Sequence, residues 1–192
     1  LITRQGANIN TPADFRGKRV GVAAINGNIE LLFRKWLVNN KVPVNEVNRM
    51  ELALPQAPDV LKAGQVDAIT TIEPFVTRLM SSGIGQVKFD YYSEVNPDLI
   101  AAFWIAKRSW ADANRRAVQD FCTVYGEGIQ WAQKNPEQYR QMELKYMKFT
   151  LNEFPTWNTN LAPSDLEFFQ SVMLEFGLLK KPLDLNRVVW KR

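Results

Sequence analysis

The stretch Gly17–Leu32, GKRVGVAAINGNIELL, runs from an apolar strand-like segment through small residues into a helical pattern. Turns of this kind hold phosphate groups in nucleotide-binding proteins, where a glycine-rich loop opens a helix. A Walker A loop needs G-x-x-x-x-G-K-[ST] and a dinucleotide site needs G-x-G-x-x-G. Neither motif is present, because five residues separate Gly21 from Gly27 and Asn28-Ile29 follow Gly27. The sequence therefore argues against a nucleotide at this turn.

The turn Asn26-Gly27-Asn28 still offers hydrogen-bonding groups at the start of a helix. We expect the backbone amides of Gly27, Asn28 and Ile29 to point out of the helix N-terminus, which attracts an anionic or polar group by roughly 0.3–1 kcal/mol. The side chains of Asn26 and Asn28 add donors and acceptors. The alternative is a plain strand-to-helix connection with Asn28 as its N-cap.

A second stretch with polar groups is Gly64–Phe75, GQVDAITTIEPF, in which a predicted strand ends at Thr70-Thr71 and Glu73-Pro74 opens a helix. In open α/β sheets, ligands bind beyond the carboxyl ends of the strands. The sequence places both Asn26-Gly27-Asn28 and Thr71-Ile72-Glu73 at that edge. The alternative role for Glu73 is a carboxylate that only complements the dipole of its helix.

Several kinds of catalysis are excluded by composition. The chain contains no histidine and a single cysteine, Cys122, so it has neither a Ser-His-Asp nor a Cys-His arrangement. The same composition argues against a zinc site. We therefore predict no catalytic residue, no metal and no cofactor, and we expect Cys122 to be a small buried hydrophobic residue.

The overall composition is that of a globular protein. The 192 residues are 46% hydrophobic and 23% charged, and the net charge of +4 is spread along the chain, which argues against nucleic-acid binding. Apolar runs are far shorter than the roughly 20 residues that span a bilayer. The opening residues LITRQGANIN lack the basic-then-apolar pattern of a signal peptide.

The first hundred residues alternate short apolar strands with amphipathic helices. We expect strands at 19–23, 47–52, 67–71 and 86–92, and helices at 28–39, 55–63 and 74–81. This alternation predicts an α/β fold with a mostly parallel sheet covered on both faces.

The second half is different in character. A strand is expected at Leu99–Ala106, followed by a helix at 112–134. A second helix is capped by Asn135-Pro136-Glu137 and is expected to bury Tyr139, Met142 and Tyr146. A third helix starts at Ser164, with Glu167 completing a capping box, and ends at Gly177. Residues 101–192 carry 15 aromatic side chains against 7 in residues 1–100. The helices form a bundle of their own or lie against a sheet outside this chain, and we favour the second interpretation.

Several motifs together resemble one family. INTPADFRGKRVGV, the turn AINGN, VLKAGQVDAITTIEPF, NPEQY and LEFGLLKKPLDL are similar to segments of the substrate-binding proteins of ABC importers, in the branch for sulfonates, taurine, nitrate and thiamine-pyrimidine precursors. KAGQVDAI followed by IEP is the most specific of these motifs. The resemblance covers nearly the whole chain and implies a periplasmic-binding-protein-like type II fold.

In that fold, two α/β lobes are joined by two crossovers and hold the ligand between them. The resemblance implies that residues 1–100 form the ligand-binding lobe two and residues 101–192 a crossover strand and the helical C-terminal part of lobe one. The N-terminal half of lobe one would precede Leu1. Hinge motion would occur near Thr3–Gln5 and Ala101–Ala106.

The resemblance also implies site residues. Asn26, Gly27 and Asn28 would match the lobe-two loop that donates amides to the polar or anionic group of the ligand, and Thr71 and Glu73 would match the second loop. Asn28 departs from the Ser or Thr that the family often carries there. With Glu73 beside the cleft, a cationic or heterocyclic ligand such as an aminopyrimidine would fit better than a small anion.

The function implied is capture of a small solute and its delivery to ABC permease subunits, in a periplasmic or otherwise extracytoplasmic location. The alternatives are a ligand-sensing domain of a signalling protein and a pyrimidine-synthase-like enzyme, whose chemistry consumes a histidine that this sequence lacks. Because half of the pocket would be missing, we expect residues 1–192 alone to bind solute weakly or not at all and to hide their apolar helix faces in a homodimer.

Overall fold

The computed structural model describes residues 1–148, 150–151 and 156–190. The chain divides into two compact units. The first joins Leu1–Leu99 with Phe168–Pro182, and the second joins Ile100–Glu167 with Leu183–Arg192. The expected division was between residues 1–100 and 101–192, so the structure differs in grouping Phe168–Pro182 with the first unit.

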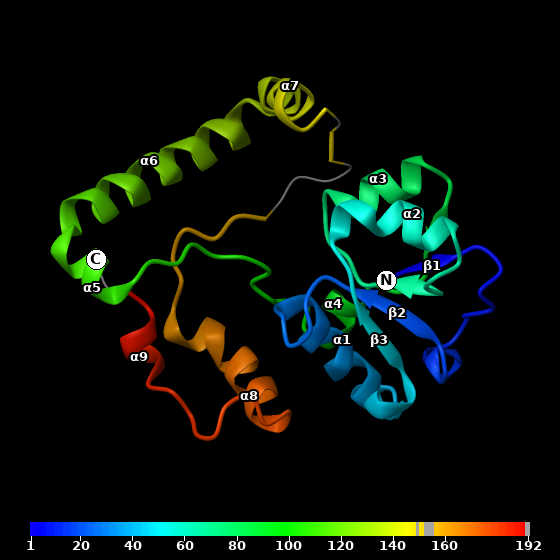
Figure 1. The fold of residues 1–192 in the computed structure, drawn as a ribbon. Coiled ribbons are helices and arrows are strands. Elements are labelled where there is room, and N and C mark those ends of the chain that lie inside the picture. Colours follow the sequence, from blue (N-terminus) through cyan, green and yellow to red (C-terminus); the bar gives the residue numbers. More distant parts are fainter. Residues whose placement is uncertain (149, 152–155, 191–192) are drawn as a thin grey trace. The chain divides into compact units, whose positions relative to one another are not determined.

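Within its described residues, the first unit is built on a five-stranded sheet in the order β3-β2-β4-β1-β5 (Figure 1). The strands are β1 (Ile2–Arg4), β2 (Arg19–Val22), β3 (Asn48–Glu51), β4 (Ala68–Ile69) and β5 (Gly85–Val87). β2 pairs in parallel with β3 and β4, whereas β1 runs antiparallel to β4 and β5. Only β1 opposes the direction of the others, so the predicted α/β sheet is mixed, with two parallel and two antiparallel pairings.

Helices cover both faces of this sheet (Figure 1). The helices are α1 (Asn28–Asn39), α2 (Ala57–Lys62), α3 (Phe75–Ser81) and α4 (Tyr91–Val95), with the short 3-10 helices η1 (Pro12–Phe15), η2 (Val44–Glu46) and η3 (Leu54–Gln56). Side chains of α1 and α4 belong to one buried cluster and those of α2 and α3 to another. Because side chains alternate along a strand, Ala68 lies in the first cluster and Ile69 in the second.

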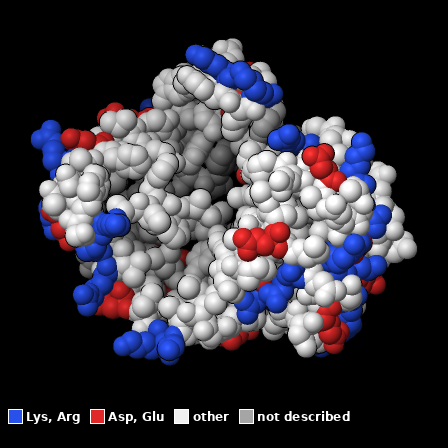
Figure 2. Space-filling view, viewed as in Figure 1, with Lys and Arg blue, Asp and Glu red and all other residues white. Residues whose placement is uncertain are grey.

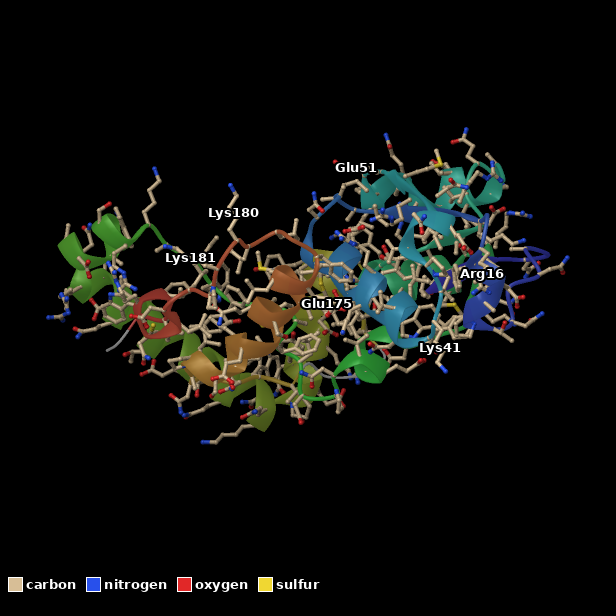
Figure 3. All side chains as sticks on the ribbon, turned by 90° about the horizontal axis from the view of Figure 1, so that it is seen from below. Arg16, Lys41, Glu51, Glu175, Lys180 and Lys181 are labelled. Atoms are coloured by element: carbon tan, nitrogen blue, oxygen red, sulfur yellow. The ribbon has the colours of Figure 1, made fainter. Side chains whose placement is uncertain are left out.

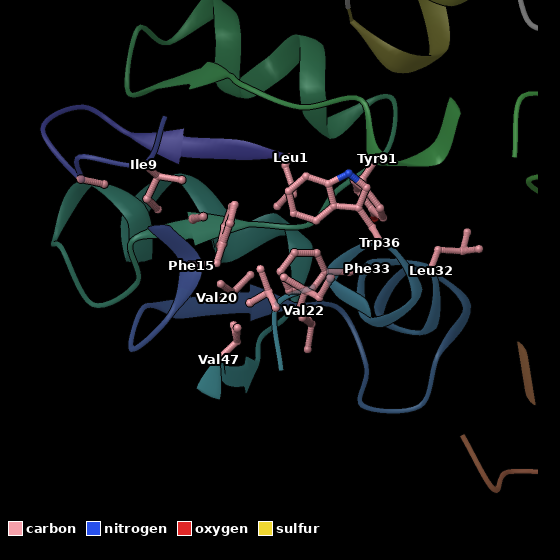
Figure 4. Packing of buried hydrophobic residues seen from close by; sticks show 14 residues of the cluster. Leu1, Ile9, Phe15, Val20, Val22, Leu32, Phe33, Trp36, Val47 and Tyr91 are labelled. Carbon is pink, nitrogen blue, oxygen red and sulfur yellow. The ribbon is translucent and has the colours of Figure 1, made fainter. Parts of the chain in front are cut away.

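The larger cluster is built on aromatic rings from segments that are far apart in the sequence (Figure 4). The ring of Trp36 in α1 packs edge-on against Phe15, with 5.6 Å between centroids, and lies 5.1 Å from the ring of Phe89. Its indole nitrogen donates to Glu94 Oε2 at 2.7 Å. The apolar face predicted for residues 28–39 is thus buried, and it joins α1 to α4.

The expected strand at 86–92 is only partly correct. β5 ends at Val87, and the chain turns at Asp90 into α4. The hydroxyl of Ser93 donates to Asp90 Oδ2 at 2.6 Å, which stabilises the first turn of that helix. Apolar Phe89 and Tyr91 suit a strand as well as a helix, and burial in the aromatic cluster decides between them.

Helix α8 (Glu167–Glu175) explains why Phe168–Pro182 belong to the first unit. Lys35 Nζ donates to Glu175 Oε2 at 2.7 Å across 140 residues of sequence, and the guanidinium of Arg34 lies 4.1 Å from the ring centroid of Phe176. The rings of Phe168 and Phe169 pack against the larger cluster.

The sequence predicted the end of this C-terminal helix better than its start. Gly177 follows α8 with a left-handed φ of 69°, as the sequence predicts for a helix C-terminus. The predicted capping box of Ser164 and Glu167 is wrong. Instead, Asp165 Oδ2 accepts a hydrogen bond of 2.7 Å from the backbone of Ala162, at the start of the 3-10 helix η4 (Pro163–Leu166) that precedes α8.

The second unit consists of helices and irregular segments in its described residues. In addition to η4, its helices are α5 (Arg108–Ala113), α6 (Arg115–Lys134), α7 (Pro136–Met147) and α9 (Leu185–Val188). The predicted helix start at Asn135-Pro136 is confirmed. The predicted helix at 112–134 is interrupted at Asn114, whose side chain donates back to Trp110 O at 2.8 Å. Among the helices that the structure describes, none is long and apolar enough to cross a membrane.

The strand expected at Leu99–Ala106 is wrong for this structure, because none of these residues joins a sheet. Their side chains are largely exposed, with Trp104 at 68% and Ile105 at 85% exposure. A strand needs a hydrogen-bonding partner, and no described segment of the second unit supplies one. The segment is apolar, as a strand would be, but an apolar pattern does not by itself supply a neighbouring strand.

Apolar helix faces in the second unit are also exposed. A groove of about 630 Å³ runs along α6 and α7 and is lined mainly by apolar side chains, among them Phe121, Tyr125 and Trp157. The expected burial of Met142 and Tyr146 is wrong, since they are 46% and 70% exposed. Cys122 is half-buried rather than buried.

Candidate functional site

The carboxyl ends of β2 and β4 lie next to each other, as the sequence predicted. These two strands pair in parallel, with Gly21 opposite Ile69. Beyond the pair, both the backbone amide and the hydroxyl of Thr70 donate to Gly21 O, at 2.9 and 3.3 Å. Because parallel neighbours end at the same edge of a sheet, the segments that follow them, Ala23–Asn28 and Thr71–Pro74, begin side by side.

The turn before α1 differs from the expected geometry at Gly27. Gly27, rather than Asn28, is the N-cap of α1. Its amide donates to Ala24 O at 3.1 Å, so this donor is used within the turn and the expectation that it points outward is wrong. A Cβ at Gly27 would lie 3.1 Å from the same oxygen, which explains why the turn favours glycine. Asn26 adopts a left-handed φ of 62° and is exposed, as is Asn28.

A buried carboxylate lies beneath this turn. The side chain of Glu30, in the first turn of α1, is fully buried, and its Oε2 accepts a hydrogen bond of 3.1 Å from the amide of Asn26. Its Oε1 accepts from Arg49 Nη1 of β3, and Arg34 Nη1 lies 3.8 Å from Oε2. A buried charge is stable only when paired, and here the pairing joins the turn, α1 and β3.

Sequence reasoning missed this cluster. Glu30 and Arg34 have the i, i+4 spacing of a helical ion pair, which is a visible signal. Arg49 gives no comparable signal, because its approach to Glu30 depends on the pairing of β2 with β3. Burial lowers the pKa of the Arg34 guanidinium, the Glu30 carboxylate opposes that change, and the nearby Arg49 adds to it.

A second carboxylate holds the turn from β3. Glu51, at the end of β3 (Figure 3), accepts a hydrogen bond of 3.2 Å from the amide of Ile25 through Oε2. The amides of Ile25, Asn26 and Gly27 are therefore all bonded inside the protein. The conformation of the turn is fixed by side chains from two neighbouring elements.

The second loop presents fewer free groups than its sequence suggests. Thr71 is buried, and its hydroxyl lies 3.5 Å from Ile72 O. The carboxylate of Glu73 accepts from the backbone amide of Thr77 at 3.1 Å and from its hydroxyl at 3.0 Å. Glu73 thus stabilises the start of α3, which is the alternative role that the sequence left open.

The chemistry available at this edge is hydrogen bonding. Within residues 1–148, 150–151 and 156–190, no group of three or more His, Cys, Asp or Glu side chains is placed to hold a metal ion. On the face seen in Figure 2, basic and acidic side chains are interspersed around the first unit. The edge combines exposed amide side chains with a network of buried ion pairs beneath them.

Two solved structures with a similar fold are periplasmic binding proteins. The periplasmic aliphatic sulphonate binding protein SsuA from Escherichia coli matches with a TM-score of 0.79 at 19% identity, over 98% of this chain and 67% of its own. The periplasmic nitrate-binding protein NrtA from Synechocystis PCC 6803 matches with a TM-score of 0.70 at 13% identity, over 97% of this chain and 60% of its own.

One enzyme has a similar fold as well. The desulfurization enzyme DSZB matches with a TM-score of 0.68 at 17% identity, over 97% of this chain and 71% of its own. The fold therefore does not by itself separate binding from catalysis. A sequence comparison with curated proteins finds no significant match.

The family is settled by sequence. The family model described as NMT1/THI5 like matches residues 1–139, which is more than half of the chain. This stretch contains four of the five motifs on which the resemblance rested and the whole candidate site, and LEFGLLKKPLDL at residues 174–185 lies beyond it. The periplasmic-binding-protein-like α/β fold predicted from them is confirmed by the structural matches. The chain belongs to the NMT1/THI5-like family.

Proposed function

We propose that this chain is the solute-binding part of an ABC importer and that it holds a small polar or anionic organic solute at the carboxyl edge of the sheet in its first unit. The observation that carries the proposal is the side-by-side position of two loops, Ala23–Asn28 and Thr71–Pro74, beyond the parallel strands β2 and β4. Ligands bind at this edge in open α/β sheets.

The solute classes that fit are sulfonates, nitrate-like anions and thiamine-pyrimidine precursors. The likeness to sulphonate- and nitrate-binding proteins supports the first two. The third rests on the resemblance of the sequence motifs to the branch that includes binding proteins for such precursors. Asn26, Gly27, Asn28, Thr71 and Glu73 remain the proposed contact region, with Gly27 acting through turn conformation and Glu73 through the start of α3.

We further propose that the solute is released to permease subunits outside the cytoplasm and that the chain has no catalytic role. The absence of histidine disfavours the pyrimidine-synthase alternative, whose chemistry consumes that residue. The comparisons give no support to a homodimer, and we do not propose one.

The test is a nuclear magnetic resonance titration of the ¹⁵N-labelled chain with ethanesulfonate, nitrate and an aminopyrimidine, up to about 100 mM because weak binding is expected. At least one solute should shift the amide resonances of residues 23–28 and 70–74 in a saturable way. Asn28→Ala should weaken that binding, whereas Asn39→Ala, at the opposite end of α1, should leave it unchanged. Saturable shifts confined to other residues would contradict the proposed site.

A further inference from the structure

The side chain of Asn26, an exposed residue of the turn, is hydrogen-bonded to the guanidinium of Arg34. Arg34 Nη1 donates to Asn26 Oδ1 at 3.2 Å. A guanidinium carries donors and no acceptor, so the oxygen of the Asn26 amide must face Arg34. The amide nitrogen Nδ2 lies on the other branch of the same planar group and, among the described residues, donates to none.

Arg34 is itself held firmly. Its guanidinium lies over the ring of Phe176, 4.1 Å from the centroid, and 3.8 Å from the buried carboxylate of Glu30. Its side chain is only 14% exposed. Stacking and an ion pair together restrict the rotation of a guanidinium, so the donor that meets Asn26 has little freedom to turn away.

The backbone amides of residues 25–27 are already bonded within the protein. The amide of Ile25 is bonded to Glu51, that of Asn26 to Glu30 and that of Gly27 to Ala24. Of the three amides that the sequence predicted to point outward, Gly27 is therefore already bonded, whereas those of Asn28 and Ile29 belong to the first turn of α1. Of residues 25–27, the side-chain nitrogen of Asn26 is the donor that remains for a solute.

We propose that Arg34, supported by Glu30, is a positioning residue that fixes Asn26 with its Nδ2 donors outward, so that the solute group held at this turn is a hydrogen-bond acceptor such as a sulfonate, carboxylate or nitrate oxygen. This inference rests on the function proposed above. It reverses the preference for a cationic or amino group that Glu73 suggested, because the Glu73 carboxylate is bonded to Thr77.

The test compares two probes of similar size and opposite hydrogen-bonding character, ethanesulfonate and ethylammonium chloride, at constant ionic strength. In the unaltered chain, ethanesulfonate shifts the Asn26 side-chain NH₂ resonance and ethylammonium does not. Asn26→Asp keeps the shape and the bond to Arg34 but replaces the outward donors by an acceptor, so ethanesulfonate binding weakens by about tenfold or more. Unchanged ethanesulfonate affinity in this variant would overturn the proposal.

Arg34 is tested by a matched pair of variants. Arg34→Met removes the donors, and we expect about a threefold or greater loss of ethanesulfonate affinity together with averaging of the Asn26 side-chain resonances. Arg34→Lys restores a donor, so we expect it to recover part of the ethanesulfonate affinity and part of the ordering of the Asn26 side chain. Lys35→Met removes the same charge from the next residue, which pairs with Glu175, and leaves affinity and resonances unchanged. Equal losses in Arg34→Met and Lys35→Met would indicate a general charge effect and overturn the positioning role.

One measurement needs no solute and separates this inference from the proposed function. Solvent exchange of the Arg34 Nη1 protons should be slower in the unaltered chain than in Asn26→Ala, because Asn26 Oδ1 accepts one of them. If exchange is slow but neither probe nor nitrate binds, the proposed function fails at this turn while the orientation of Asn26 holds. If exchange is equally fast in both chains, the inference fails whatever binds.

Discussion

Arg19 holds Asp67 by three hydrogen bonds: its backbone amide and Nε donate to Oδ2 at 3.0 and 3.3 Å, and its Nη2 donates to Oδ1 at 3.2 Å. Arg4 Nη2 adds a fourth at 3.2 Å. One carboxylate thus joins β1, β2 and the segment that leads into β4, at the edge of the sheet opposite the candidate site.

This contact makes the stability of the first unit depend on pH. Burial raises the pKa of Asp67, but hydrogen bonds from Arg19 and Arg4 outweigh it and leave the pKa below its usual value. A carboxyl group with a lowered pKa stabilises the fold above its unfolded pKa of about 3.9 and loses that effect as pH falls through the folded value. Stability should therefore decline below about pH 4.

Asp67→Asn should lower the free energy of unfolding at pH 7 by about 1–3 kcal/mol and flatten the acid decline. The measurement is urea unfolding followed by circular dichroism between pH 7 and pH 3. Glu46→Gln is the control, because its ion pair with Arg16 is exposed and is worth at most about 1 kcal/mol. Parallel pH profiles for Asp67→Asn and the unaltered chain would contradict the assignment.

Trp36 should be among the most sensitive positions of the core. It is 1% exposed and packs against aromatic rings of η1 and of the segment before α4. Trp36→Ala should cost about 3–5 kcal/mol, because the cavity left behind cannot close fully. Trp104→Ala, at a residue 68% exposed, should cost less than about 1 kcal/mol. Similar losses in thermal unfolding for the two variants would refute the burial difference.

Gly85 should resist even a methyl group. A Cβ there would lie 2.5 Å from Ile2 Cγ2 and 3.1 Å from Thr3 O, and the second of these is backbone that cannot move aside. We expect Gly85→Ala to destabilise the sheet by about 1–3 kcal/mol through overpacking. Adding Ile2→Val to Gly85→Ala should recover part of the lost unfolding free energy, because valine has a smaller side chain. If the effects of the two substitutions simply add in the double variant, the contact between residues 2 and 85 is not the cause of the loss.

Gly126 should behave in the opposite way. It lies inside α6, and a Cβ there would meet nothing within 4 Å. Gly126→Ala should stabilise the second unit by about 0.5–1 kcal/mol, because alanine loses less backbone entropy in a helix. A higher midpoint in chemical unfolding followed at 222 nm checks this expectation. A lower midpoint would mean that the position is crowded in solution.

Much of this protein was determined by local sequence signals. The period of apolar residues located α1 at its observed bounds, and the strand-turn-helix pattern brought the loops after β2 and β4 to one edge of the sheet. The family was readable as well, because its motifs are short and contiguous. The absence of histidine excluded whole classes of catalysis without any structure.

Tertiary structure decided what depends on neighbours distant in sequence. The pairing of Arg49 with Glu30 required β2 and β3 to lie in register, and the assignment of α8 to the first unit required Lys35 to meet Glu175. It also determined which polar groups are already bonded: the amide of Gly27 and the carboxylate of Glu73 have partners inside the protein. The apolar run Leu99–Ala106 forms no strand, because no neighbouring strand pairs with it. A sequence shows which groups a residue carries, but only the fold determines which of them are already bonded.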